Sequence, residues 1–193
     1  MASGVDPNKV ILTGENPFIR LSESEGGEFT TRSSFWRVLL SPGGPGHVLS
    51  IESELTDNKP RIYSDNIAMA RWLQGALEQY MHPPFGDQGL EVIEAEFQSS
   101  GDLRSFWMET IVSRDDEITM TWYDLGEPFV AHSEPGSRPT MPHGVYTVLI
   151  PAAGARLVIN EESARGRPFP QDRGGTPSST SCLAFSETWL SVR

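Results

Sequence analysis

The stretch from Glu91 to Arg193 is a succession of short segments in which apolar residues occupy every second position. Such alternation places the apolar side chains on one face of a sheet. We expect strands at Val92–Gln98, Phe106–Ser113, Glu117–Asp124, Pro128–Ser133, Val145–Ile150, Ala155–Asn160 and Cys182–Val192. With turn residues between them, these segments predict a mainly β protein, folded as a single antiparallel β-barrel of calycin-like type.

Two turn signals add detail to this prediction. The dense apolar run Phe35–Leu40 is followed by the Pro/Gly-rich Ser41–Gly46 and then by the alternating segment His47–Leu55. This order is typical of a β-hairpin. The sequence PAAG between Ile150 and Ala155 is short enough to form a second hairpin turn.

One amphipathic helix is predicted at about residues 65–81, packed against the barrel. Ser64 or Asp65 can accept an unpaired N–H at its start, and Pro83 stops it after its last turn. Glu78 lies outside the apolar stripe. The stripe itself has residues three and four apart: Met69, Trp72, Leu73, Ala76, Leu77 and Tyr80.

The length and the net charge of the chain indicate how many domains it forms and which partners it is expected to avoid. The 193 residues suit one domain spanning 1–193. A net charge of −11 without a basic stripe opposes binding to nucleic acid and to anionic membranes. The N-terminal segment MASGVDPNKV lacks the pattern of a signal peptide, and no apolar run reaches membrane-spanning length. We therefore expect a cytoplasmic protein.

Cofactor motifs are missing from the sequence. It contains no P-loop, no GxGxxG fingerprint, no GxSxG elbow and no CxxC pair, so we expect no nucleotide cofactor and no cofactor of any other kind. The single cysteine, Cys182, cannot form a disulfide within the chain. Its place in an apolar strand favours a core residue.

Two acids interrupt apolar strand faces. Glu109 lies between Trp107 and Ile111, and Glu187 lies between Phe185 and Trp189. A carboxyl buried among indole and alkyl groups has a raised pKa unless a donor or cation compensates. Such a group suits a general acid or base near neutral pH. Either acid is a candidate catalytic residue; solvated positions on an outer face are the alternative.

Two histidines and a third acid lie close together along the chain. Alternation places His132 and Glu134 on one strand face, and the return of the chain can bring His143 beside them. His132 is a candidate acid or base, and His143 a candidate ligand contact. The run from Gly126 to His132 resembles the first half of a cupin metal motif, although its second histidine is replaced by Glu134. A metal site at these residues and a solvated loop both stay open.

Aromatic residues are spread over the predicted barrel strands. Trp107, Phe185 and Trp189 share faces with the candidate acids, and Tyr123 lies at the end of its strand, where it can donate to a ligand. These residues can line an apolar ligand cavity. The connection at about 161–180 carries several arginines, which can close over a carboxylate or phosphate.

The leading hypothesis is an enzyme that needs no nucleotide cofactor. It would bind a partly aromatic or apolar small molecule inside the barrel and move protons with Glu187, Glu109 and His132, in a lyase, isomerase or hydrolase reaction. One alternative is a lipocalin-like carrier or sensor that binds such a ligand without chemistry. A second is a metal-dependent, cupin-like enzyme. A small homo-oligomer is possible if strand edges stay open.

Overall fold

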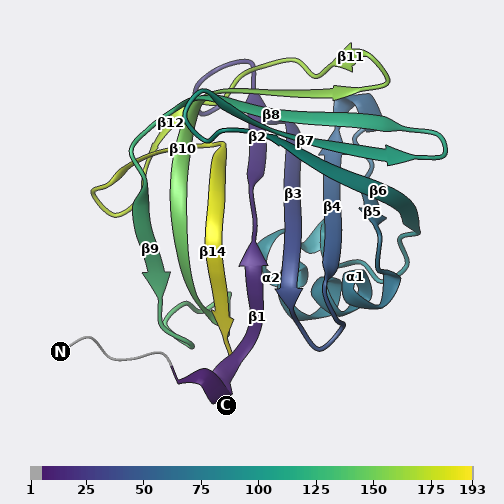
Figure 1. The fold of residues 1–193 in the computed structure, drawn as a ribbon. Coiled ribbons are helices and arrows are strands. Elements are labelled where there is room, and N and C mark those ends of the chain that lie inside the picture. The colour runs from purple at the N-terminus through teal and green to yellow at the C-terminus, as the bar shows by residue number, and fades with distance from the viewer. Residues whose placement is uncertain (1–5, 193) are drawn as a thin grey trace.

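The chain is mainly β in the computed structural model, which describes residues 6–192. A 12-stranded sheet runs in the order β1-β14-β2-β3-β4-β5-β6-β7-β8-β10-β11, and β9 pairs with β10. Because β14 also pairs with β10, the sheet closes on itself as a ring (Figure 1). The predicted β-rich fold is confirmed at this level, whereas the calycin-like type stays a prediction.

The strands of this sheet are β1 (Val10–Glu15), β2 (Phe18–Ser22), β3 (Phe29–Leu40), β4 (Gly46–Ser53), β5 (Arg61–Ser64), β6 (Val92–Gly101), β7 (Phe106–Ser113), β8 (Glu117–Leu125), β9 (Phe129–Ser133), β10 (Gly144–Ile159), β11 (Glu162–Ser163) and β14 (Cys182–Leu190). The connection predicted at 161–180 also contains β12 (Pro170–Asp172) and β13 (Pro177–Ser179), which form a separate hairpin. The helical elements are η1 (Pro7–Lys9), η2 (Glu54–Thr56), α1 (Ile67–Leu73), η3 (Gln74–Glu78), α2 (Gln79–Met81) and η4 (Pro83–Gly86).

One pairing in the ring departs from the antiparallel prediction. Strands β5 and β6 run parallel, with Ile62 opposite Val92 and Ser64 opposite Glu94. The helical elements α1, η3, α2 and η4 all lie between these two strands in the sequence. A parallel pair needs such a long crossover connection, whereas a hairpin turn would produce antiparallel neighbours.

The predicted hairpin turn at PAAG is wrong, because β10 continues through it as one strand of 16 residues. The first part of β10 pairs with β9 and β14, and the part from Ala152 onwards pairs with β8. Pro151, which has no N–H to donate, sits where the partner strands change. This single long strand closes the ring.

The helix begins later than predicted and is not regular. Asn66 caps it by accepting the backbone N–H of Met69 over 3.1 Å, while the hydroxyl of Ser64 accepts the N–H of Asn66. The elements α1, η3 and α2 follow one another without a break, and η3 is a π-helical segment. A π segment holds one extra residue in its turn, which rotates the side chains after it around the helix axis.

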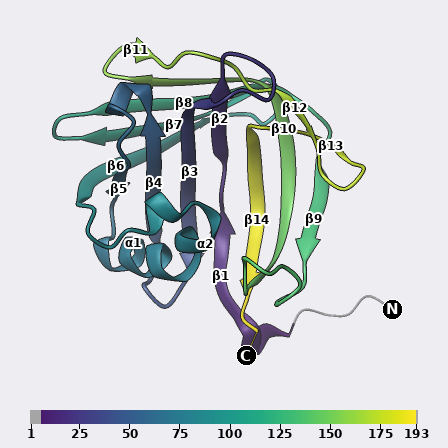
Figure 2. The same ribbon diagram turned by 180° about the vertical axis from the view of Figure 1, so that it is seen from behind.

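Apolar side chains fill most of the ring interior. Its core draws buried side chains from nearly every ring strand: Ile19, Leu21, Phe35, Leu49, Ile51, Tyr63, Ala95, Ile111, Ile118, Met120, Trp122, Ile150, Ala152, Ala155, Leu157, Ile159 and Leu183. A second core lies outside the ring, where the helix packs on β3, β4 and β5 (Figure 2). It includes Trp36, Val48, Ile62, Leu73 and Trp189. Strands such as β3 are therefore buried on both faces.

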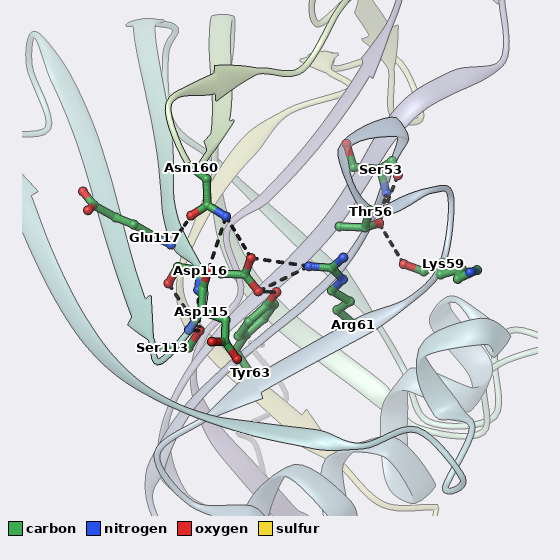
Figure 3. A network of polar contacts seen from close by, with 10 residues as sticks. All are labelled: Ser53, Thr56, Lys59, Arg61, Tyr63, Ser113, Asp115, Asp116, Glu117 and Asn160. Atoms are coloured by element: carbon green, nitrogen blue, oxygen red, sulfur yellow. Dashed lines mark hydrogen bonds and ion pairs between the residues drawn. The ribbon is translucent and has the colours of Figure 1, made fainter.

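A polar network fastens one end of the ring (Figure 3). The hydroxyl of Tyr63 donates to Oδ2 of Asp116 over 2.7 Å, and Arg61 forms an ion pair with the same oxygen at 3.3 Å. The side-chain amide of Asn160 donates to Oδ1 of Asp116 over 3.1 Å. The network joins β5 to the β7–β8 and β10–β11 turns, and burial is the main cause that raises the pKa of Tyr63. We interpret it as structural.

A search of residues 6–192 for a helix long and apolar enough to cross a membrane finds none.

Candidate functional site

A cavity of about 670 Å³ lies on the outer face of the ring, not in its interior. Strands β2, β3, β9, β10 and β14 form its floor, and the helical segment borders it on one side. The β12–β13 hairpin lies at the upper ends of β9 and β10 in Figure 2 and borders the cavity on the opposite side from the helix. The ligand site was expected inside the barrel, so this location differs from the prediction.

The lining combines apolar, acidic and basic side chains. The acidic side chains are Glu78 and Glu187, and the positively charged side chains are Arg20, Arg32, Arg138 and Arg173. The other lining residues are Asn16, Phe18, Ser33, Ser34, Tyr80, Met81, His82, Phe85, Phe129, Val130, Ala131, His132, Ser133, Thr140, Met141, Val145, Thr147, Leu149, Gly174, Thr176, Ala184 and Trp189.

Glu187 is buried in the floor of the cavity, with 4% of the residue exposed. Its Oε1 accepts the indole N–H of Trp189 over 2.6 Å. Burial raises the pKa of Glu187 to about 7, and the negative charge of Glu78 acts in the same direction. The hydrogen bond donated by Trp189 lowers the pKa of Glu187 and only partly offsets these effects. Glu187 can therefore give or take a proton near neutral pH.

Glu78, at the end of η3, is the second buried acid of the cavity and is fully inaccessible to solvent. Its Oε1 accepts from the hydroxyl of Ser34 over 2.7 Å and from the indole N–H of Trp36 over 2.6 Å. Burial raises the pKa of Glu78, against the opposing effects of Ser34, Trp36 and Arg20. Its Oε2 has no hydrogen-bond partner among the described residues.

The two acids are held in the same way. Each accepts an indole N–H, and the rings of the donors Trp36 and Trp189 contact each other at 6.3 Å between centroids. Within residues 6–192, no cationic side chain forms an ion pair with either acid. Two like charges in one desolvated site favour a state in which one carboxyl is protonated and the other ionised.

Phe185 does not share the face of Glu187 and Trp189, contrary to the simple alternation. Ser186 has a φ of 54°, and the pairing of β10 with β14 shifts register opposite this position. The bulge adds one residue to the strand, so Ala184 and Glu187 face the cavity while Phe185 faces the ring interior. There Phe185 packs edge-on against Trp107, with centroids 5.9 Å apart.

Glu109 is buried, as the alternation predicted, but it lies away from the cavity. It belongs to the inner face of β7, two residues from the core residue Ile111. Its carboxyl accepts from Trp107 over 2.8 Å and from Ser99 over 2.9 Å, and it pairs with Arg37 at 3.2 Å. Burial raises the pKa of Glu109, with Trp107, Ser99 and Arg37 opposing. Glu109 and Glu187 therefore do not act at one centre.

The remaining predicted site residues are dispersed. His132 lies at the cavity edge with an exposed ring stacked on Tyr146, at 5.4 Å between centroids, and Glu134 accepts the hydroxyl of Tyr146 over 2.8 Å. His143 instead contacts the ring of Tyr80, and burial lowers its pKa. The exposed Tyr123 does not line the cavity.

The three residues considered for a metal site are thus not brought together. Among residues 6–192, no group of three or more His, Cys, Asp or Glu side chains is arranged to hold a metal ion. His132 and Glu134 are both engaged with Tyr146, while His143 lies at the helix.

Glu78 is the acid that the sequence analysis missed. The helical pattern left it outside the apolar stripe, yet the buried helix positions are Met69, Ala70, Leu73, Gln74, Leu77 and Glu78. The buried positions form adjacent pairs, 69 and 70, 73 and 74, and 77 and 78, which recur every four residues. This period is longer than the 3.6 residues per turn of an α-helix. Read with a four-residue period, the sequence would have placed Glu78 on the buried face.

Comparisons with protein-family models, with curated proteins and with solved structures gave no significant match to this chain.

Proposed function

We propose that the protein is a small-molecule enzyme that uses Glu187 and Glu78 as an acid–base pair in the outer cavity. The observation that carries this proposal is the convergence of two buried carboxyls, each held by an indole N–H, on one cavity. The reaction class would be a proton-transfer reaction of the lyase, isomerase or hydrolase type.

The two acids are suited to different roles. With a pKa of about 7, Glu187 is present in both protonation states near neutral pH, which general catalysis requires. Glu78 has one oxygen fixed by Ser34 and Trp36 and a second, buried oxygen without a hydrogen-bond partner in the described residues. When one carboxyl holds a proton and the other is ionised, one can donate while the other accepts.

The surroundings support binding of an organic molecule. The apolar residues Phe129, Leu149 and Ala184 cover part of the floor, and the volume matches that of small-molecule sites. Glu78 and Ser133, two of the lining residues, also have buried oxygens that lack hydrogen-bond partners in the described part of the chain, Oε2 and Oγ. The same unpaired oxygens also fit a second candidate function, a carrier protein that binds the ligand and does not convert it.

A general probe can test for a reactive base here. In 5-nitrobenzisoxazole a base removes the ring C–H proton as the N–O bond breaks, which yields a coloured phenolate. We expect turnover that rises with pH to a midpoint near 7, as Glu187 ionises. Glu187→Gln should lower the rate by about 10²-fold or more.

Glu109→Gln is the matched control. Like Glu187, Glu109 is buried and accepts the indole N–H of a tryptophan two residues away, in its case Trp107 at 2.8 Å. It lies outside the cavity, so its rate should stay near that of the parent protein. Equal rates for Glu187→Gln and the parent would contradict catalysis by Glu187. A purified protein that retains an unmodified ligand, detected by mass spectrometry, would favour the carrier.

A further inference from the structure

Of the four arginines that line the cavity, three lie close together without an acidic partner among the described residues. Arg20 on β2, Arg32 on β3 and Arg173 on the β12–β13 turn all face it. Among the described residues, no carboxylate lies within ion-pair distance of any of the three.

The three charges are also close to one another. Arg20 and Arg32 are direct cross-strand partners, and the positive charges of Arg173 and Arg32, after burial, lower the pKa of Arg20. The guanidinium groups of Arg20 and Arg173 both lie over the ring of Phe18, at 5.3 and 5.6 Å from its centroid. Like charges placed directly opposite each other destabilise a strand pair.

Some other arginines of this protein have acidic partners: Arg37 pairs with Glu15 and Glu109, Arg61 with Asp116, and Arg165 with Glu54. The cluster at the cavity differs in that it places three positive charges close together, with no described carboxylate paired to any of them. An anionic group held between the guanidiniums would relieve the repulsion, and arginine binds carboxylate and phosphate oxygens with paired hydrogen bonds.

We propose that Arg20, Arg32 and Arg173 form an anion subsite, so that the cavity takes a small organic molecule with a carboxylate or phosphate group. This proposal rests on the proposed function, since it names the substrate class of the same cavity. The anionic group would lie at the arginines, and the organic part would extend over Phe18 and the apolar floor towards Glu78 and Glu187.

The position of Glu78 agrees with this arrangement. Arg20 and Glu78 lie close enough for the charge of Arg20 to lower the pKa of Glu78, yet they form no ion pair. Oε2 of Glu78 keeps no partner in the described chain. Glu78 and Arg20 both line the cavity, so one ligand can place its anionic end at Arg20 and another part towards Glu78.

Isothermal titration with phenyl phosphate, benzoate and the neutral benzyl alcohol tests the proposal. We expect at least one anion to bind, more tightly than benzyl alcohol and less tightly as salt is added. Arg32→Met should weaken anion binding by about 10- to 100-fold, because it removes charge-assisted hydrogen bonds. Arg165→Met is the matched control, since Arg165 pairs with Glu54 away from the cavity.

The melting temperature separates a ligand role from a structural one. Without ligand, Arg32→Met should raise it by about 1–3 °C, because a like-charge contact is removed. Arg173→Met is a second variant, on an exposed turn, and it too should weaken anion binding.

Preference for phenyl phosphate or for benzoate identifies the anionic group, and either result supports the subsite. The proposal is overturned if neither anion binds, if benzyl alcohol binds as tightly, or if both arginine variants keep the parent affinity. These outcomes involve no turnover, so they leave the result with the neutral benzisoxazole probe unaffected.

Discussion

The indole nitrogen of Trp189 donates to Oε1 of Glu187 over 2.6 Å, between side chains two residues apart on β14. The same relation recurs on β7, where Trp107 donates to Glu109 over 2.8 Å. The two sites differ in charge, because Glu109 also pairs with Arg37, whereas no described cation pairs with Glu187. This difference leaves Glu187 without a paired cation among the described residues, whereas Glu109 is part of an ion pair.

Replacing Trp189 with phenylalanine should raise the pKa of Glu187. The change keeps an aromatic ring but removes the N–H that stabilises the ionised carboxylate. We expect the titration midpoint of Glu187 to move up by about one pH unit, followed by carboxyl ¹³C NMR. Trp107→Phe removes the equivalent donor from Glu109 and should leave the midpoint of Glu187 unchanged. A midpoint that falls in Trp189→Phe would refute the assignment of this hydrogen bond to the charged form.

The stability of the protein should fall as pH rises from about 4.5 to 7. The folded state holds a proton on Glu187 up to a pKa of about 7, whereas the unfolded chain releases it near 4.5, so the stabilisation is complete below that lower pKa. The linked loss is roughly 3 kcal/mol by pH 7. Urea unfolding of Glu187→Gln across this range should lack much of this slope. The exposed Glu96→Gln is the control and should retain it.

Removing Arg37, the cation that pairs with Glu109, should destabilise the fold. Arg37→Met leaves the carboxyl of Glu109, which is 1% exposed, without its ion-pair partner. Because Arg37 is itself partly exposed, we expect a loss of about 2 kcal/mol in the free energy of unfolding, less than for a fully buried pair. Adding Glu109→Gln should recover part of that loss in a double-mutant cycle. Additive effects of the two changes would contradict a direct coupling.

A methyl group at Gly14 should disturb the strands beneath the cavity. Gly14 lies opposite Glu187 on β14 and opposite Val38 on β3, and a Cβ there would lie 2.2 Å from the backbone oxygen of Arg37. Since backbone cannot easily yield, Gly14→Ala should cost about 2 kcal/mol of unfolding free energy. Gly75→Ala, in the exposed part of the π segment, has room and should be neutral or slightly stabilising. Equal melting temperatures for the two variants would count against the close approach at Gly14.

Local pattern in the sequence was sufficient for several features. Alternation located the strands that became β6, β7, β8, β9 and β14, and it marked Glu109 and Glu187 as acids on buried faces. The helix was predicted within two residues of its observed start at Ile67 and to its last residue, Met81. These features depend on neighbours in the chain, whose side-chain spacing decides which face an apolar residue takes.

Long-range packing decided the rest. The alternation of a strand distinguishes its two faces but does not say which face turns inwards. Here β3 and β14 are buried on both faces: the ring core covers one, and the outer cavity and the helix lie against the other. The bulge at Ser186 and the π segment ending at Glu78 each shift the register by one residue, which brought Glu187 and Glu78 to the same cavity. Such shifts are stabilised by contacts with distant segments. The sequence by itself therefore marked Glu109 and Glu187, while only the tertiary structure buried Glu78 and placed it at the same cavity as Glu187.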